Sequence, residues 1–146
     1  MKDPQAWILP VVLLVLYAFA LPCMAAGFEL TPGGVAYRDL QVGSGAVATS
    51  GDVVSVHLTG WTRKQGHPDQ AFFSTHRDQQ PLSFVVGTPR VLSGWNEGVQ
   101  GMREGGRRLL RIPPEQGIGA RTFEDRIPAN TTLVFIVELL KVEPGN

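Results

Sequence analysis

The pattern that most constrains the fold is a regular alternation of apolar side chains in two well-separated segments of the chain. It occupies Val53–Trp61 and Leu133–Val142, and a period of two is that of a β-strand with one buried face. The predicted buried faces carry Val54, Val56 and Leu58 in the first segment, and Leu133, Phe135, Val137 and Leu139 in the second. Both segments are therefore predicted to be strands with one buried face.

Shorter strands are predicted between these two segments and before them. They cover Ala36–Val42, Leu82–Val86 and Arg107–Ile112, and each ends near glycine or proline. The sequence thus predicts an α+β domain in which an antiparallel sheet closes over helical structure.

One helix is predicted over Ser93–Met102. Trp95, Val99 and Met102 recur at helical spacing and form one apolar stripe. Ser93 is a suitable N-cap, and the pair Gly105-Gly106 is expected to end the helix. A core helix would show the same stripe, so the spacing alone does not make Trp95 a binding residue.

Composition excludes several classes of function. The chain has 146 residues and a formal net charge of zero, which disfavours nucleic acid as a partner because phosphate binders carry a basic excess. Its single cysteine is Cys23, and His57, His67 and His76 are scattered, so no metal site is expected. We expect no cofactor either, because there is no phosphate-binding loop, G-x-S-x-G turn or H-E-x-x-H helix.

The first 26 residues are typical of a targeting segment. Lys2 precedes an apolar run, Trp7–Leu21, and small residues follow at Ala25 and Ala26. This order predicts a signal peptide over residues 1–26 and a folded domain over residues 27–146. An uncleaved membrane anchor is the alternative, since the run approaches the length of a membrane span. Either way the protein is expected to be exported, to a bacterial periplasm or outside the cell.

Four segments, in order, resemble the FKBP family of peptidyl-prolyl cis-trans isomerases. The resemblance extends from about Gly34 to Val142. The segments are G-D-V-V-S-V-H-L-T-G at Gly51–Gly60, F-F-S-T at Phe72–Thr75, V-L-S-G-W-N-E-G-V at Val91–Val99, and I-P-A-N-T-T-L-V-F-I-V-E-L-L at Ile127–Leu140.

The resemblance implies a half-open antiparallel sheet wrapped around one short helix, with an aromatic pocket between them for a substrate proline. Trp95 would form the floor of this pocket. The implied catalytic residues are Phe72, Val91, Leu92, Trp95, Ile127 and Phe135, and the implied substrate contacts are Leu58, Phe73, Leu82, Ile118 and Phe123. The implied partners are proline-containing polypeptides, and the protein is expected to be a monomer.

The sequence departs from the family pattern mainly at polar positions. Leu58 and Phe73 stand where the family has a tyrosine and an aspartate, and Ile118 replaces the tyrosine that donates to the ligand carbonyl. Asp78 stands at the position of an arginine, and Arg90 at that of a common glutamate. Two interpretations follow: an isomerase of reduced activity that helps exported proteins fold, or a weak or inactive chaperone that binds apolar segments.

Overall fold

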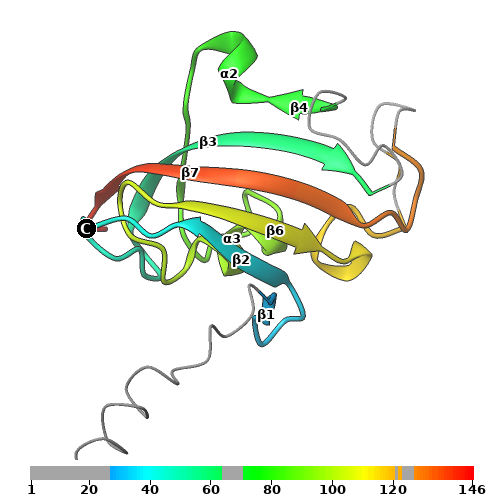
Figure 1. Ribbon diagram of the computed structural model, residues 1–146, viewed down its shortest axis with the longest axis horizontal. Helices are drawn as coiled ribbons and strands as arrows, with labels where there is room; N and C mark the ends of the chain where they lie inside the picture. Colours follow the sequence, from blue (N-terminus) through cyan, green and yellow to red (C-terminus); the bar gives the residue numbers. More distant parts are fainter. Residues whose placement is uncertain (1–26, 64–70, 121, 123–126) are drawn as a thin grey trace, which may run out of the picture.

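The computed structural model describes residues 27–63, 71–120, 122 and 127–146. Within this part, seven strands form one antiparallel sheet in the order β1-β2-β6-β7-β3-β4, and β5 also pairs with β3 (Figure 1). The strands are β1 (Glu29–Leu30), β2 (Ala36–Gln41), β3 (Val53–Thr62), β4 (Phe73–Ser74), β5 (Leu82–Val85), β6 (Arg107–Ile112) and β7 (Leu133–Glu143).

The two long alternating segments lie side by side, as β3 and β7. Their pairing runs from Val53 opposite Glu143 to Thr62 opposite Leu133, with one irregularity between Ser55 and Val56. The side chains predicted to face inward are all buried: Val54, Val56, Leu58, Leu133, Phe135, Val137 and Leu139. The prediction of an antiparallel α+β fold is confirmed.

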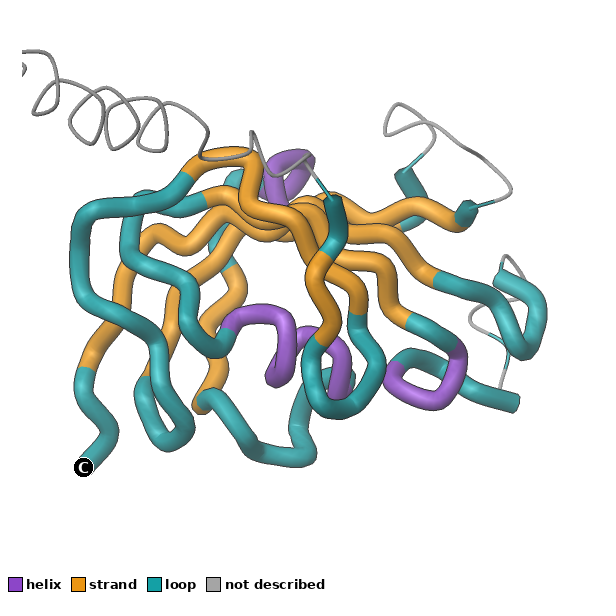
Figure 2. Tube along the Cα trace, turned by 60° about the horizontal axis from the view of Figure 1, so that its bottom comes forward, coloured by secondary structure: helices purple, strands orange, loops and turns teal. Residues whose placement is uncertain are grey.

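A short helix, α3 (Ser93–Val99), lies in the hollow of the curved sheet (Figure 2). Gly94 and Gly98 face β6, where an added Cβ would lie 2.5 Å from Ile112 and 2.4 Å from Leu110. Larger residues at either glycine would push the helix away from the sheet. The two glycines therefore set the depth at which α3 sits.

The helix begins at Ser93 as predicted, but its predicted N-cap and its predicted C-terminal end were wrong. Leu92, not Ser93, occupies the N-cap position, and no side chain caps the helix there. At the other end, the backbone turns extended at Gln100 (ψ 132°), so Met102 lies beyond the helix. Met102 lies in the following turn, where its N–H donates to the Val99 carbonyl and its carbonyl accepts from the Ala48 N–H, and its side chain packs in the core. The i+7 spacing that suggested a longer helix thus arises from a loop.

Four elements are too short for periodicity to reveal. They are β1, β4, a helical turn α2 (Thr75–Asp78), and a 3-10 turn η2 (Pro114–Gln116). Strand β4 and α2 lie beyond β3 at one edge of the sheet, whereas β1 borders β2 at the opposite edge. In the described part of the chain, no helix has both the length and the apolar character needed to cross a bilayer.

Candidate active site

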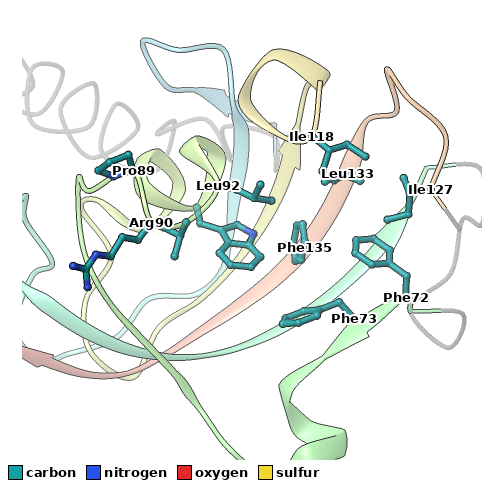
Figure 3. A pocket seen from close by; sticks show the side chains of 11 residues that line it. Phe72, Phe73, Pro89, Arg90, Leu92, Ile118, Ile127, Leu133 and Phe135 are labelled. Atoms are coloured by element: carbon teal, nitrogen blue, oxygen red, sulfur yellow. The ribbon is translucent and has the colours of Figure 1, made fainter. Parts of the chain in front are cut away.

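A pocket of about 380 Å³ opens between α3 and the neighbouring strands (Figure 3). Its lining comes from β4 and the residue before it, the loop that leads into α3, α3 itself, the chain after η2, and β7. The lining residues are Phe72, Phe73, Pro89, Arg90, Val91, Leu92, Trp95, Ile118, Ile127, Leu133 and Phe135. The wall is therefore almost entirely apolar, and residues distant in sequence build it.

Four aromatic rings form the centre of the pocket. Trp95 and Phe135 meet edge to face, with centroids 5.3 Å apart and planes at 87°. Phe72 meets Phe135 in the same way at 5.8 Å, and Phe73 tilts against Trp95 at 6.0 Å. Edge-to-face contacts of this kind are favoured by ring quadrupoles. The rings thus hold one another in place and leave a concave apolar surface.

The loop that leads into α3 is fixed to the helix by Asn96. Its Oδ1 accepts from the backbone N–H of Gly87 at 2.9 Å, and its Nδ2 donates to the carbonyl of Thr88 at 2.7 Å. Both polar atoms of the Asn96 side chain thus form hydrogen bonds with the loop backbone. Pro89, Arg90 and Val91, which follow directly, are therefore presented to the pocket from an anchored backbone.

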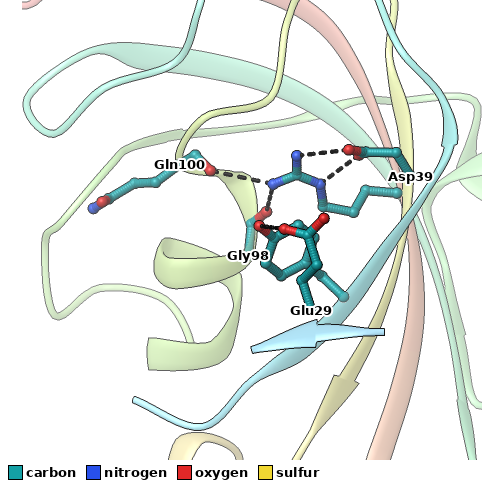
Figure 4. A network of polar contacts seen from close by, with 6 residues as sticks. Glu29, Asp39, Gly98 and Gln100 are labelled. Atoms are coloured by element: carbon teal, nitrogen blue, oxygen red, sulfur yellow. Dashed lines mark hydrogen bonds and ion pairs between the residues drawn. The ribbon is translucent and has the colours of Figure 1, made fainter. Parts of the chain in front are cut away.

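The opposite end of α3 is held by the buried guanidinium of Arg108 on β6 (Figure 4). Its Nη1 donates to the carbonyls of Gly98 and Gln100, at 3.1 and 3.2 Å. Its Nε and Nη2 bind both carboxylate oxygens of Asp39, at 2.7 and 3.2 Å. A cation on the last carbonyls of a helix is favourable, so Arg108 anchors the helix that carries Trp95.

A tyrosine completes this network on the solvent side. The Arg108 guanidinium stacks on the Tyr37 ring, 4.4 Å from its centroid, and the Tyr37 hydroxyl donates to Glu29 Oε2 at 2.6 Å. This hydrogen bond, followed by burial, raises the pKa of Tyr37 above its ordinary value. Strands β1, β2 and β6 are thereby linked to the base of α3.

The polar inventory of the pocket is small. Among its described lining residues, Arg90 is the only charged side chain, and the Trp95 indole is the only neutral one with a hydrogen-bonding atom. Trp95 Nε1 is buried and has no hydrogen-bond partner. An acid–base pair is therefore missing from the described lining, and no His, Cys, Asp or Glu cluster suited to a metal occurs in the described ranges.

Most of the residues expected at the site come together there. Phe72, Val91, Leu92, Trp95, Ile127 and Phe135 line the pocket, and so do Phe73 and Ile118. Pro89, Arg90 and Leu133 also line it, although sequence reasoning did not assign them to it. Leu133 lies two positions before Phe135 on the same face of β7, which is a signal that could have revealed it.

Three expected contact residues do not appear in the lining. Leu58 has no exposed surface, because it points into the core beneath β3. Leu82 packs against that core from β5. For both, the resemblance implies a contact with substrate; the structure places them outside the lining of this pocket and in contact with the core. Phe123 lies outside the described residues.

The comparisons with known proteins agree with this geometry. The family model for FKBP-type peptidyl-prolyl cis-trans isomerase matches residues 45–140. The chain belongs to this family. A Neisseria meningitidis "FK506-binding protein" is 44% identical over 110 residues, which are 75% of this chain and 97% of that protein. Mouse "Peptidyl-prolyl cis-trans isomerase FKBP2" is 38% identical over 138 residues, covering 94% of each.

Solved FKBP structures share the fold. Escherichia coli FkpA superimposes with a TM-score of 0.72 and 31% identity, over 94% of this chain but 60% of the FkpA chain. AtFKBP13 superimposes with a TM-score of 0.70 and 31% identity, over 78% of this chain and 97% of its own. The prediction of an FKBP-type peptidyl-prolyl cis-trans isomerase is thus confirmed, for the fold and for the enzyme class.

Proposed function

We propose that this isomerase acts in the aromatic pocket on X-Pro bonds of exported proteins and assists their folding. The observation that carries the proposal is the apolar lining of about 380 Å³ around Trp95 and Phe135. A pocket of this size takes a proline ring together with part of the adjoining peptide. The catalytic residues we propose are Phe72, Val91, Leu92, Trp95, Ile127 and Phe135, with Phe73 and Ile118 as further contacts.

An apolar pocket suits this reaction because no covalent bond is made or broken. Rotation about the peptide bond has a barrier of about 18–20 kcal/mol, since amide resonance is lost in the twisted state. The planar amide has the larger dipole, so a water-excluding wall disfavours it more than the twisted amide. This difference in binding lowers the barrier, and each 1.4 kcal/mol is worth about tenfold in rate.

The pocket holds the ring, but it offers little to the client's carbonyl groups. Ile118 lines the pocket at the position where a hydroxyl donor is usual in the family, and its side chain cannot donate a hydrogen bond. A missing hydrogen bond costs about 0.5–1.5 kcal/mol, or roughly two- to tenfold in rate. We therefore expect reduced activity. The same apolar surface favours the second candidate, a chaperone that binds apolar segments with little turnover.

Two substitutions at Ile118 test the proposal. NMR exchange spectroscopy of an X-Pro peptide with the purified protein gives kcat/KM. Ile118→Tyr should raise it about two- to tenfold over Ile118→Phe, which supplies the same ring without the donor. Equal values of kcat/KM for the two variants would show that residue 118 does not occupy the position that donates to the client's carbonyl.

A substitution at Trp95 tests whether catalysis resides in this pocket. Trp95→Leu should lower kcat/KM by about tenfold or more. Trp61→Leu, at a tryptophan outside the lining, serves as the control, with folding of both variants checked by circular dichroism. The opposite outcome is a wild-type protein that leaves the isomerisation rate equal to that in buffer alone and still suppresses aggregation of an unfolded client. That result would favour the chaperone hypothesis over the isomerase hypothesis.

A further inference from the structure

The pocket carries one charge, and it lies at one end of the apolar lining. Figure 3 shows Pro89 and Arg90 on one side of Leu92 and Phe135, and Phe72 and Ile127 on the other. The Arg90 guanidinium extends outward, away from the aromatic centre. A client whose proline ring occupies the centre therefore places a neighbouring residue, rather than the ring, beside Arg90.

Arg90 has no role within the fold that would account for its charge. The residue is exposed, and it forms no hydrogen bond or ion pair with any part of the chain that the structure describes. By contrast, Arg77 donates to the Ala71 carbonyl, Arg107 pairs with Glu138, and Arg108 pairs with Asp39. The guanidinium of Arg90 is thus free to bind an external group.

The backbone beneath Arg90 is well held. Asn96 fixes the two residues Gly87 and Thr88 just before Pro89, and proline restricts the backbone at its own position. Val91 and Leu92, on the other side, pack against the core. An anchored arginine loses less freedom on binding a carboxylate than one on a loose loop, and its planar fork matches a carboxylate in two-point contact.

We propose that Arg90 makes this isomerase prefer clients that carry an aspartate or glutamate next to the isomerised proline. The inference rests on the proposed function, because it assigns a substrate preference to the same pocket. An ion pair exposed to solvent is modest, so the preference for a carboxylate over a neutral amide of the same size is about two- to fivefold in kcat/KM. The preference falls at high salt, because ions screen exposed charges.

The test compares peptides that differ only beside the proline. Acetylated and amidated peptides carry Glu, Gln or Lys before the proline in one set and after it in the other, and NMR exchange gives kcat/KM without a coupling protease. In at least one set, the wild-type protein should favour Glu over Gln about two- to fivefold. The ratio should approach one in 1 M salt, where the screening length is about 3 Å.

Variants of Arg90 assign the preference to this residue. Arg90→Gln should bring the Glu-to-Gln ratio to about one, and Arg90→Glu should reverse it in favour of Lys. Arg103→Gln changes the net charge equally, at an exposed arginine outside the pocket lining, and should keep the wild-type ratio. A wild-type ratio of one in both peptide sets, or a Glu preference that survives Arg90→Gln, overturns the proposal.

A binding measurement separates this proposal from the isomerase activity itself. Titration of each peptide, followed through the indole N–H signal of Trp95, gives Kd for the same variants. If no peptide is isomerised faster than in buffer, the proposed function fails while the Kd ratio still decides the role of Arg90. A two- to fivefold Kd preference for Glu that disappears in Arg90→Gln supports it, and equal Kd values overturn it.

Discussion

At the scale of single residues, the shape of the pocket depends on Gly60, which has no side chain. Gly60 on β3 pairs with Phe135 of β7 on one side and with Phe73 of β4 on the other. A Cβ at this position would lie 2.3 Å from the Phe135 ring, which no packed structure tolerates. Glycine here lets the ring of Phe135 lie over the strand.

Asp52 gives a prediction for the dependence of stability on pH. Its Oδ2 accepts from the backbone N–H of Thr49 at 3.0 Å and from the Thr49 hydroxyl at 2.9 Å. These bonds lower the pKa of the Asp52 carboxyl below its ordinary value of 3.8. A depressed folded-state pKa stabilises the protein above the unfolded pKa, and this contribution is lost as pH falls through the folded value.

We therefore expect Asp52→Ala to lower the free energy of unfolding at pH 7, and the difference from wild type to shrink below about pH 4. Urea unfolding at several pH values measures it. Asp78→Ala is the control, because Asp78 is exposed and its carboxylate has no hydrogen bond within the described chain. A difference for Asp52→Ala that stays constant from pH 7 to pH 2 would show that the Thr49 bonds do not act through the ionised carboxylate.

At the scale of elements, α3 is short and is held by contacts at its ends. Seven residues are too few for a helix to be stable alone. Its C-terminal carbonyls bind Arg108, its Asn96 fixes the preceding loop, and its Glu97 binds Thr31 and the N–H of Gly33. The position of Trp95 therefore depends on polar contacts from three other parts of the chain.

Arg108→Met should destabilise the protein by about 2–4 kcal/mol. The variant keeps much of the side-chain volume but leaves Asp39 and the carbonyls of Gly98 and Gln100 without their partner. Denaturant unfolding measures the loss. Arg107→Met on the same strand is the matched control: its ion pair with Glu138 is at the surface, so we expect a change of about 1 kcal/mol or less. Similar losses for both variants would contradict an anchoring role for Arg108.

Sequence patterns predicted this level of structure unevenly. The strands β3 and β7 were predictable because apolar and polar side chains alternate over many residues. A strand that is buried on one face requires this alternation. The end of α3 was not, because Met102 continues the helical spacing from within a turn. Likewise Leu58 belongs to a motif that lines pockets in the family, yet its depth beneath β3 follows only from the packed structure.

At the scale of the whole molecule, the chain from Phe28 to Gly33 is tied to the sheet and to η2. The ring of Phe28 lies against the guanidinium groups of Arg111 and Arg38, 3.9 and 5.3 Å from its centroid, and Glu29 begins β1. Gln116 then donates to the carbonyl of Gly33 at 3.1 Å. We propose that residues 1–26 form a removable signal peptide, as their sequence predicts. Cleavage after Ala25 or Ala26 would leave all of these contacts intact.

The proposal predicts the N-terminus of the exported protein. Mass spectrometry of protein recovered from the producing cells should give a chain that begins at Ala26 or Gly27. Leu14→Arg is the control: a charge within the apolar run disfavours its insertion, so the chain should stay inside the cell with residues 1–26 attached. A wild-type chain that keeps Met1 and sediments with membranes would instead show that residues 1–26 act as a membrane anchor. A chain that begins at Leu21 would show that cleavage occurs at the earlier A-x-A site formed by Ala18 and Ala20.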